Sequence, residues 1–331
     1  VLFATRAPKV GGGGRFEAVS RETFLLANNV LLIAATGSVL LGTLYPLFLD
    51  ALNLGKISVG PPYFDTVFVP LMTPLVFLMG VGPLARWKEA KLPDLWQRLK
   101  WALAVSLVTA LLLPFAAGSW KPLVSFGLLL AAGIVTTTVV NVRERGRGVR
   151  GGIVAQLARQ PRSYWGMIVA HLGIAVFIVG VTMVKGYETE RDVRMSVGDK
   201  VIVGGYTLRF DGTTEATGPN YRAARGAFEV SRDGQHVTTQ FPEKRVYNAG
   251  GMPMTEAAIR STPLGDLYVS LGEPVDGGAW SVRVYHKPFI TWIWGGCLLM
   301  ALGGLLALSD RRYRVAMQRD ASAPGSATAR S

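Results

Sequence analysis

Six long apolar runs constrain the fold of this chain more than any other feature of its sequence. Each run is close to the ~20 residues that an α-helix needs to cross a hydrocarbon layer about 30 Å thick. We therefore predict an α-helical polytopic membrane protein with about six transmembrane helices. The runs cover residues 23–49, 63–84, 101–118, 122–142, 164–184 and 289–308.

The distribution of charge predicts the direction in which these helices cross the membrane. The chain has 331 residues, with 35 Lys and Arg against 22 Asp and Glu, and a formal net charge of +13. The N-terminal segment, the loops after the second and fourth runs and the C-terminal tail hold twenty basic and seven acidic residues, and the remaining charges cancel. Because short cytoplasmic segments of membrane proteins are enriched in Lys and Arg, both termini are predicted to be cytoplasmic. No basic stretch is interleaved with aromatic residues for base stacking, so we expect no nucleic-acid partner.

This topology divides the chain into five parts. The division is a cytoplasmic segment 1–22, a five-helix transmembrane region 23–185 with amphipathic cytoplasmic loops, a β-rich domain 186–288 on the non-cytoplasmic side, a sixth transmembrane helix 289–309 and a basic, disordered cytoplasmic tail 310–331. The fold class is thus a helical membrane protein with an inserted small β-rich domain, which the topology predicts to lie outside the cytoplasm.

Strand signals are frequent in the hydrophilic segment. Short alternating or β-branched stretches occur at 201–203, 206–210, 228–230, 236–240, 267–271 and 280–285. The pairs Gly204-Gly205 and Asp233-Gly234 are typical of tight hairpin turns. We predict a small β-sandwich or barrel-like domain, with the Gly-, Met- and Pro-rich stretch 248–263 as a longer loop.

Two cytoplasmic loops have an amphipathic pattern. In the stretch 91–101, Leu92, Leu95, Trp96 and Leu99 recur at helical spacing with basic residues opposite, which favours a helix lying at the membrane interface. A weaker pattern at Ile153, Val154 and Leu157 hints at a second one. The single cysteine, Cys297, lies in the last apolar run, and it is expected to be a small packing residue.

His171 is the one histidine inside an apolar run. Ionisable side chains within a membrane are costly, so each is a functional hypothesis. A neutral imidazole is a good iron ligand, and the small residues Gly166, Ala170 and Gly173 beside it would admit a flat ring or another helix. From the residues alone, three roles stay open: haem ligation, a packing hydrogen bond to a neighbouring helix, and a proton relay.

Four sequence blocks resemble the C-terminal half of the CcmF family of cytochrome c-type biogenesis proteins. The likeness extends from about residue 20 to residue 314, although Asp65 stands where we expect Asn. The blocks are NNVLLIAATGSVLLGTLYPL (28–47), ISVGPPYFDTVFVPLMTPL (57–75), YWGMIVAHLGIAVFIVG (164–180) and KPFITWIWGGCLLMALGGLLALSDRRYR (287–314).

This resemblance implies a multi-pass protein of the bacterial inner membrane that is part of a cytochrome c haem lyase (holocytochrome c synthase) complex. Such a complex takes haem from the chaperone CcmE and, with CcmH, attaches it to the CxxCH thiols of apocytochrome c. The resemblance also implies a b-type haem in the membrane, with quinol as the electron donor. His171 matches the family's axial ligand, so it is the expected haem-iron ligand.

The resemblance further implies that part of the pocket lies outside this sequence. The second axial histidine and a tryptophan-rich periplasmic segment belong to the N-terminal half of the family, on the same or a separate polypeptide. That half is therefore an expected partner, and no catalytic residue is assigned here. Two other classes remain as alternatives: a proton-coupled transport subunit, and a structural anchor that displays a periplasmic binding domain.

Overall fold

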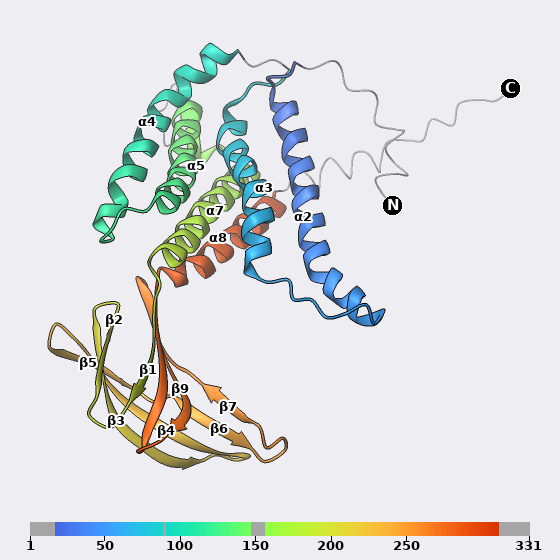
Figure 1. The fold of residues 1–331 in the computed structure, drawn as a ribbon. Helices are drawn as coiled ribbons and strands as arrows, with labels where there is room; N and C mark the ends of the chain where they lie inside the picture. The colour runs from blue at the N-terminus through green and yellow to red at the C-terminus, as the bar shows by residue number, and fades with distance from the viewer. Residues whose placement is uncertain (1–16, 89–90, 147–155, 311–331) are drawn as a thin grey trace. The chain divides into compact units, whose positions relative to one another are not determined.

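The computed structural model describes residues 17–88, 91–146 and 156–310. Six of its helices are long and apolar enough to cross a membrane, which confirms the predicted fold class of a multi-pass helical protein (Figure 1). They are α2 (Arg21–Ala51), α3 (Pro61–Val81), α4 (Leu92–Ala116), α5 (Pro122–Gly146), α7 (Arg162–Tyr187) and α8 (Ile290–Leu308). The short 3₁₀ turn η2 (Gly82–Leu84) extends the second span.

Local signals explain where these helices begin. The Ser20 side chain accepts a hydrogen bond from the Thr23 backbone N–H at 3.2 Å, which caps α2. Pro61 and Pro62 occupy the first positions of α3, where their missing N–H groups are not needed. The helices are therefore set by caps as well as by apolar length.

One predicted element is wrong. The stretch 92–100 does not form a separate interfacial helix but is the first part of α4, continuous with the third span. Its polar side finds a protein partner, because Arg98 Nη1 donates to Glu144 Oε2 of α5 at 2.9 Å. Of the second amphipathic pattern, Ile153 and Val154 lie outside the described residues.

The β-rich domain is a sandwich of two antiparallel sheets. One sheet has the strand order β1-β10-β9-β8, and the other has the order β2-β3-β4-β6-β7, with β5 paired to β4. The strands are β1 (Thr189–Met195), β2 (Lys200–Val203), β3 (Tyr206–Thr217), β4 (Tyr221–Arg232), β5 (Gln235–Gln240), β6 (Glu243–Tyr247), β7 (Pro253–Glu256), β8 (Ala258–Thr262), β9 (Gly265–Val275) and β10 (Ala279–Pro288).

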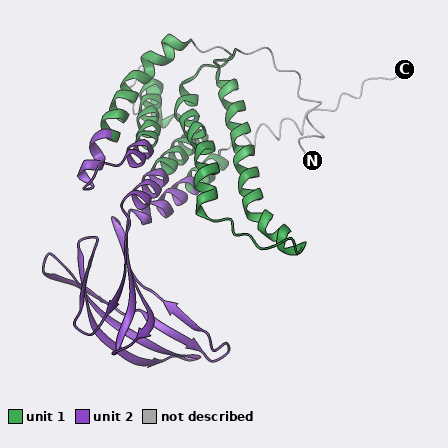
Figure 2. Ribbon diagram, in the orientation of Figure 1, with its two compact units in different colours: residues 1–110, 129–175, 302–331 green, residues 111–128, 176–301 purple. Residues whose placement is uncertain are grey.

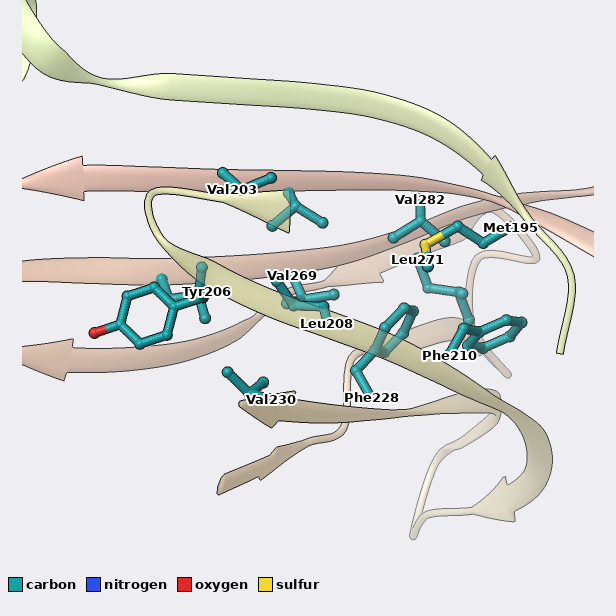
Figure 3. Close-up of a cluster of buried hydrophobic side chains, with 12 residues drawn as sticks. Met195, Val203, Tyr206, Leu208, Phe210, Phe228, Val230, Val269, Leu271 and Val282 are labelled. Carbon is teal, nitrogen blue, oxygen red and sulfur yellow. The ribbon is translucent and has the colours of Figure 1, made fainter. Parts of the chain in front are cut away.

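Alternation along the strands builds the core of the sandwich. Because successive side chains point to opposite faces of a sheet, alternate residues in the buried parts of β3, β4, β9 and β10 enter the same interior (Figure 3). Phe210 and Phe228 stack at its centre, with ring centroids 4.9 Å apart. Twelve buried side chains complete it: Met195, Val203, Tyr206, Leu208, Phe210, Phe228, Val230, Leu267, Val269, Leu271, Val282 and Val284.

The turns agree with the sequence, and the long loop does not. Gly204, Gly205, Asp233 and Gly234 all have positive φ, as the two predicted hairpin turns require. The stretch 248–263, predicted as a loop, instead contains β7 and β8. All four residues of β7 are exposed, so an alternating apolar pattern is missing from this strand.

The chain forms two compact units, coloured separately in Figure 2. Of the described residues, unit 1 comprises 17–88, 91–110, 129–146, 156–175 and 302–310, and unit 2 comprises 111–128 and 176–301. Within unit 2 the β8–β9 turn is bonded to the start of α8, since Trp292 Nε1 donates to the Pro263 carbonyl at 2.9 Å. The Phe289 N–H likewise donates to the Leu264 carbonyl at 3.0 Å.

Candidate functional site

His171 lies in α7, within the part of the helix that belongs to unit 1. It follows Tyr164 by seven residues, or about 10 Å along the helix at 1.5 Å per residue. Its side chain is half-buried. The ring is therefore partly enclosed, and part of it reaches the surface of the described helices.

A hydrogen bond fixes the chemical state of the His171 ring. Nδ1 lies 2.8 Å from the Met167 carbonyl oxygen, one helical turn earlier. A carbonyl oxygen only accepts, so Nδ1 carries the proton and donates. In the neutral ring Nε2 is then left with a free lone pair. Histidines that bind metals are commonly oriented by such a bond from the other ring nitrogen.

A cavity of about 10 Å³ adjoins His171, between α3, α5 and α7. This volume is roughly what one water molecule needs. Its walls include three polar side chains of α5, Thr137, Thr138 and Asn141, together with Met79 and Gly80 of α3. Gly80 lies next to Thr137, because a Cβ built on this glycine would be 3.5 Å from Thr137 Oγ1, an ordinary contact distance.

Polar contacts join three helices next to this cavity. The Tyr164 hydroxyl of α7 donates to Asn141 Oδ1 of α5 at 2.9 Å. Asn141 Nδ2 donates in turn to the Pro83 carbonyl of η2 at 3.3 Å. Tyr164 and Asn141 are both buried. Such bonds satisfy polar groups internally, as the membrane requires, and they hold α7 about two turns before His171.

The stripe of small residues beside His171 is occupied by a helix. A Cβ on Gly166 would lie 2.5 Å from the Gly303 carbonyl of α8, and one on Gly303 would lie 2.5 Å from the Ala170 backbone nitrogen. The contact leaves no room for a flat ring between Gly166, Ala170 and α8. Of the two occupants that the sequence left open for this stripe, the structure selects a helix.

The donor chemistry of this site fits one axial position of a haem. Among the residues that the structure describes, no group of three or more His, Cys, Asp and Glu can hold a bare metal ion. A single oriented imidazole with a free Nε2 suits an iron that is already held by a porphyrin. The 10 Å³ cavity does not hold a porphyrin, so the macrocycle would need a wall from outside the described residues.

The other two histidines have ordinary surroundings. His236 is exposed on β5, and its Nε2 lies 3.4 Å from Thr239 Oγ1. His286 lies on β10, where its ring packs on Gly204 and near the Tyr206 ring, with centroids 5.9 Å apart. Burial and the charge of Arg232 lower the pKa of His286, against an opposing effect of Asp266. Neither residue lies beside His171.

The sequence indicated His171 but missed its surroundings. Thr137 and Thr138, which line the cavity at His171, were not identified there. Asn141 was not singled out either. An amide at the end of an apolar run is a signal that would have drawn attention to it.

Comparisons with known proteins match nearly the whole chain. A family model described as the CcmF C-terminal beta-sandwich matches residues 186–288. The cytochrome c-type biogenesis protein CcmF of Pseudomonas aeruginosa is 48% identical over 95% of this chain and 48% of its own length. CcmF of Escherichia coli is 45% identical over 98% of this chain and 49% of its own length.

More distant proteins agree in extent. The cytochrome c-type biogenesis protein NrfE of Haemophilus influenzae is 31% identical over 95% of this chain and 48% of its own length. A solved structure of the cytochrome c haem lyase CcmF has a TM-score of 0.70 at 26% identity, covering 88% of this chain and 46% of that one. The chain thus spans about half the length of the curated relatives that it matches.

Proposed function

The chain belongs to the CcmF family of cytochrome c-type biogenesis proteins, and on that premise we propose that it is the haem-holding half of a cytochrome c haem lyase. In this role it holds a b-type haem within the membrane and takes part in the transfer of haem to the CxxCH thiols of apocytochrome c. The observation that carries the proposal is the hydrogen bond from His171 Nδ1 to the Met167 carbonyl, which leaves Nε2 for iron.

His171 is the axial ligand in this proposal. The Met167 carbonyl orients the ring, and the bonds among Tyr164, Asn141 and Pro83 fix α7 about two turns before it. A haem bound there supplies one-electron chemistry, with quinol as the proposed electron donor.

The remaining parts of the pocket are assigned to the other half of the family protein. His171 supplies one axial ligand, and the second ligand and the outer wall of the porphyrin site come from the N-terminal CcmF half, on the same or a separate polypeptide. The small size of the cavity at His171 supports this division.

We assign the chain to the bacterial inner membrane, with both termini cytoplasmic and domain 186–288 on the periplasmic side. The excess of Lys and Arg in alternate loops supports this orientation. The β-sandwich is then on the side where CcmE, CcmH and apocytochrome c are proposed to dock.

Spectroscopy of the purified assembly tests the ligand assignment. The protein that contains this chain is purified with its N-terminal half, and reduced-minus-oxidised spectra are recorded for the wild type, His171→Ala and the matched control His236→Ala. We expect His171→Ala to lose the b-type signal and His236→Ala to retain it. Added imidazole should restore the signal in His171→Gly, because it fills the space of the lost ring. A full complement of b-type haem in His171→Ala overturns the assignment.

A further inference from the structure

A second hollow lies next to the cavity at His171. It is an open groove of about 290 Å³ within unit 1. The groove and the cavity share three wall residues, Pro83, Asn141 and Met167, so the two spaces are neighbours. The same groove is lined by two guanidinium groups, Arg21 at the start of α2 and Arg145 near the end of α5.

Aromatic rings hold both guanidinium groups in place. The Arg21 Cζ lies 4.8 Å from the centre of the Trp87 ring, and the Arg145 Cζ lies 4.5 Å from the centre of the Tyr164 ring. Stacking uses the face of a guanidinium and leaves its N–H donors free in the plane. One N–H group of Arg145, on Nη1, donates to Gln160 Oε1 at 3.1 Å. The pair therefore presents oriented donors to the groove.

The nearby carboxylates bond to other groups. Glu22 Oε2 accepts from the Lys88 backbone N–H, and Glu144 Oε2 accepts from Arg98. Asp310 Oδ2 accepts from the Ser163 backbone N–H at 3.0 Å. The charge of Glu22 acts on Arg21 from the neighbouring position, but in residues 17–88, 91–146 and 156–310 neither Arg21 nor Arg145 forms an ion pair with a carboxylate. The described lining of the groove holds two guanidinium groups and no carboxylate, which makes an oxyanion the matching ligand.

The position of the groove relates an oxyanion bound there to His171. Tyr164, whose ring lies against the Arg145 guanidinium, precedes His171 by about 10 Å along α7. Met167, whose carbonyl orients the His171 ring, lines this groove as well as the cavity at His171, so the groove adjoins the space beside the ring.

We propose that Arg21 and Arg145 bind the two propionate carboxylates of the haem whose iron His171 ligates. This inference rests on the proposed function. It assigns a positioning role to two residues of the groove, because they fix the rotation of the porphyrin about the axial bond. The phosphate of an anionic lipid has the same oxyanion chemistry, and the experiment distinguishes the two sources.

A chemical double-mutant cycle tests this pairing. The purified assembly, depleted of haem, is loaded with haem or with its dimethyl ester, in which both propionates are uncharged. Transfer of the ligand to apomyoglobin is then timed for the wild type and for the double variant Arg21→Gln/Arg145→Gln. Arg143→Gln serves as the control, because it removes an exposed arginine of the same helix that does not line the groove.

The wild type should release the ester about tenfold faster than haem, as expected for the loss of charge-assisted bonds worth about 1.4 kcal/mol. The double variant should release both ligands at the same rate, and Arg143→Gln should behave as the wild type does. The release rates of haem and of its ester are compared within the same variant. A general loss of folding would speed both, so it would not by itself produce the expected change in their ratio. In Arg21→Lys/Arg145→Lys the charge remains and the ratio should be intermediate.

Three outcomes overturn the inference. An unchanged ratio in the double variant, with haem still lost in His171→Ala, overturns the propionate contacts and leaves the proposed function intact. An unchanged ratio with loss of a co-purified anionic phospholipid, measured by mass spectrometry, assigns the arginines to a lipid headgroup. Retention of haem in His171→Ala overturns the proposed function and this inference together.

Discussion

In the β-sandwich, protein encloses the large apolar side chains, whereas the membrane helices leave most of theirs on the outside. The twelve core residues of the sandwich are 7% exposed or less. In the most apolar stretch of each helix, the buried share ranges from only 6% in α2 to 39% in α5. The sandwich thus completes its own core, and the helices depend on lipid or on another polypeptide to cover them. This contrast suits a helical region that forms only one wall of a cofactor pocket.

Separating the two regions gives the largest expected effect. We predict that residues 186–288 fold alone, because their core needs no contact with the helices. The isolated segment should show a β-type circular dichroism spectrum and one cooperative thermal transition without detergent. The helical segment 20–185 should aggregate under the same conditions. A non-cooperative transition in the isolated sandwich would remove the basis of the comparison.

The second-largest expected effect comes from truncating a side chain at the centre of the sandwich. Phe228 is fully buried and stacks on Phe210, so Phe228→Ala should lower the free energy of unfolding of the isolated domain by about 3–5 kcal/mol. The exposed Met252→Ala should change it by less than about 0.5 kcal/mol. Both values are measured by urea denaturation.

The matching truncation in the helices sharpens the contrast. Leu298 of α8 is 71% exposed, and Leu298→Ala in the detergent-solubilised chain should leave the thermal midpoint nearly unchanged. A large shift would mean that this face of α8 is packed against protein in the solubilised chain.

The elements that the sequence predicted well have a local signal. The six spans follow from apolar length, and strands such as β3 and β9 follow from alternation. The boundary of α4 was missed because, after Pro93 in the first turn, no helix breaker separates the amphipathic stretch 92–100 from the third apolar run, so the helix continues. β7 was missed because all of its residues are exposed.

The candidate site was predictable only in part, for a different reason. A lone histidine in an apolar run is visible in one sequence. Its neighbours Thr137 and Thr138 lie more than thirty positions away along the chain, and the bond between Tyr164 and Asn141 spans 23 residues. Such pairing depends on how helices pack, and no local pattern records it.

Within the sandwich, a buried carboxylate gives an effect of intermediate size. The Glu243 side chain accepts hydrogen bonds from Arg225 at 2.6 Å and from Arg245 at 2.7 Å. Glu243→Gln weakens these charge-assisted bonds, so we expect the free energy of unfolding to fall by about 2 kcal/mol at neutral pH. Urea denaturation of the isolated domain measures the loss.

The same carboxylate makes stability depend on acid. Burial by itself would raise the pKa of Glu243, but the hydrogen bonds and charges of Arg245 and Arg225 lower the pKa below its ordinary value of 4.5. A lowered pKa stabilises the fold above pH 4.5, and this stabilisation is lost as the pH falls through the folded-state value. The Glu243→Gln domain should therefore lose less stability below pH 4.5 than the wild type. Parallel curves for the two proteins would contradict this reading.

Removing a polar contact between the helices should lower stability by a smaller amount. Tyr164→Phe removes the hydroxyl that donates to Asn141, and interhelical hydrogen bonds of this kind are worth about 1 kcal/mol. A small fall in the thermal midpoint in detergent is expected. Tyr45→Phe is the control, since Tyr45 is exposed on α2, and it should have no effect. Loss of folding in Tyr164→Phe would show that the helices are held by fewer contacts than their packing indicates.

Another small expected effect is a change in slope at His286. Burial, together with the charge of Arg232, lowers its pKa below the ordinary value of 6.5, while Asp266 opposes the shift. The unfolded domain therefore binds more protons than the folded one just below pH 6.5, and stability falls as the pH drops through that range. In His286→Gln this group no longer titrates, so urea midpoints between pH 7 and 5 should decline less steeply than in the wild type or in the exposed control His236→Gln. An identical slope in all three would mean that the ring on Gly204 accepts its proton as freely in the folded domain as in the unfolded chain. Water would then reach the β10 side of the sandwich more easily than it reaches the core.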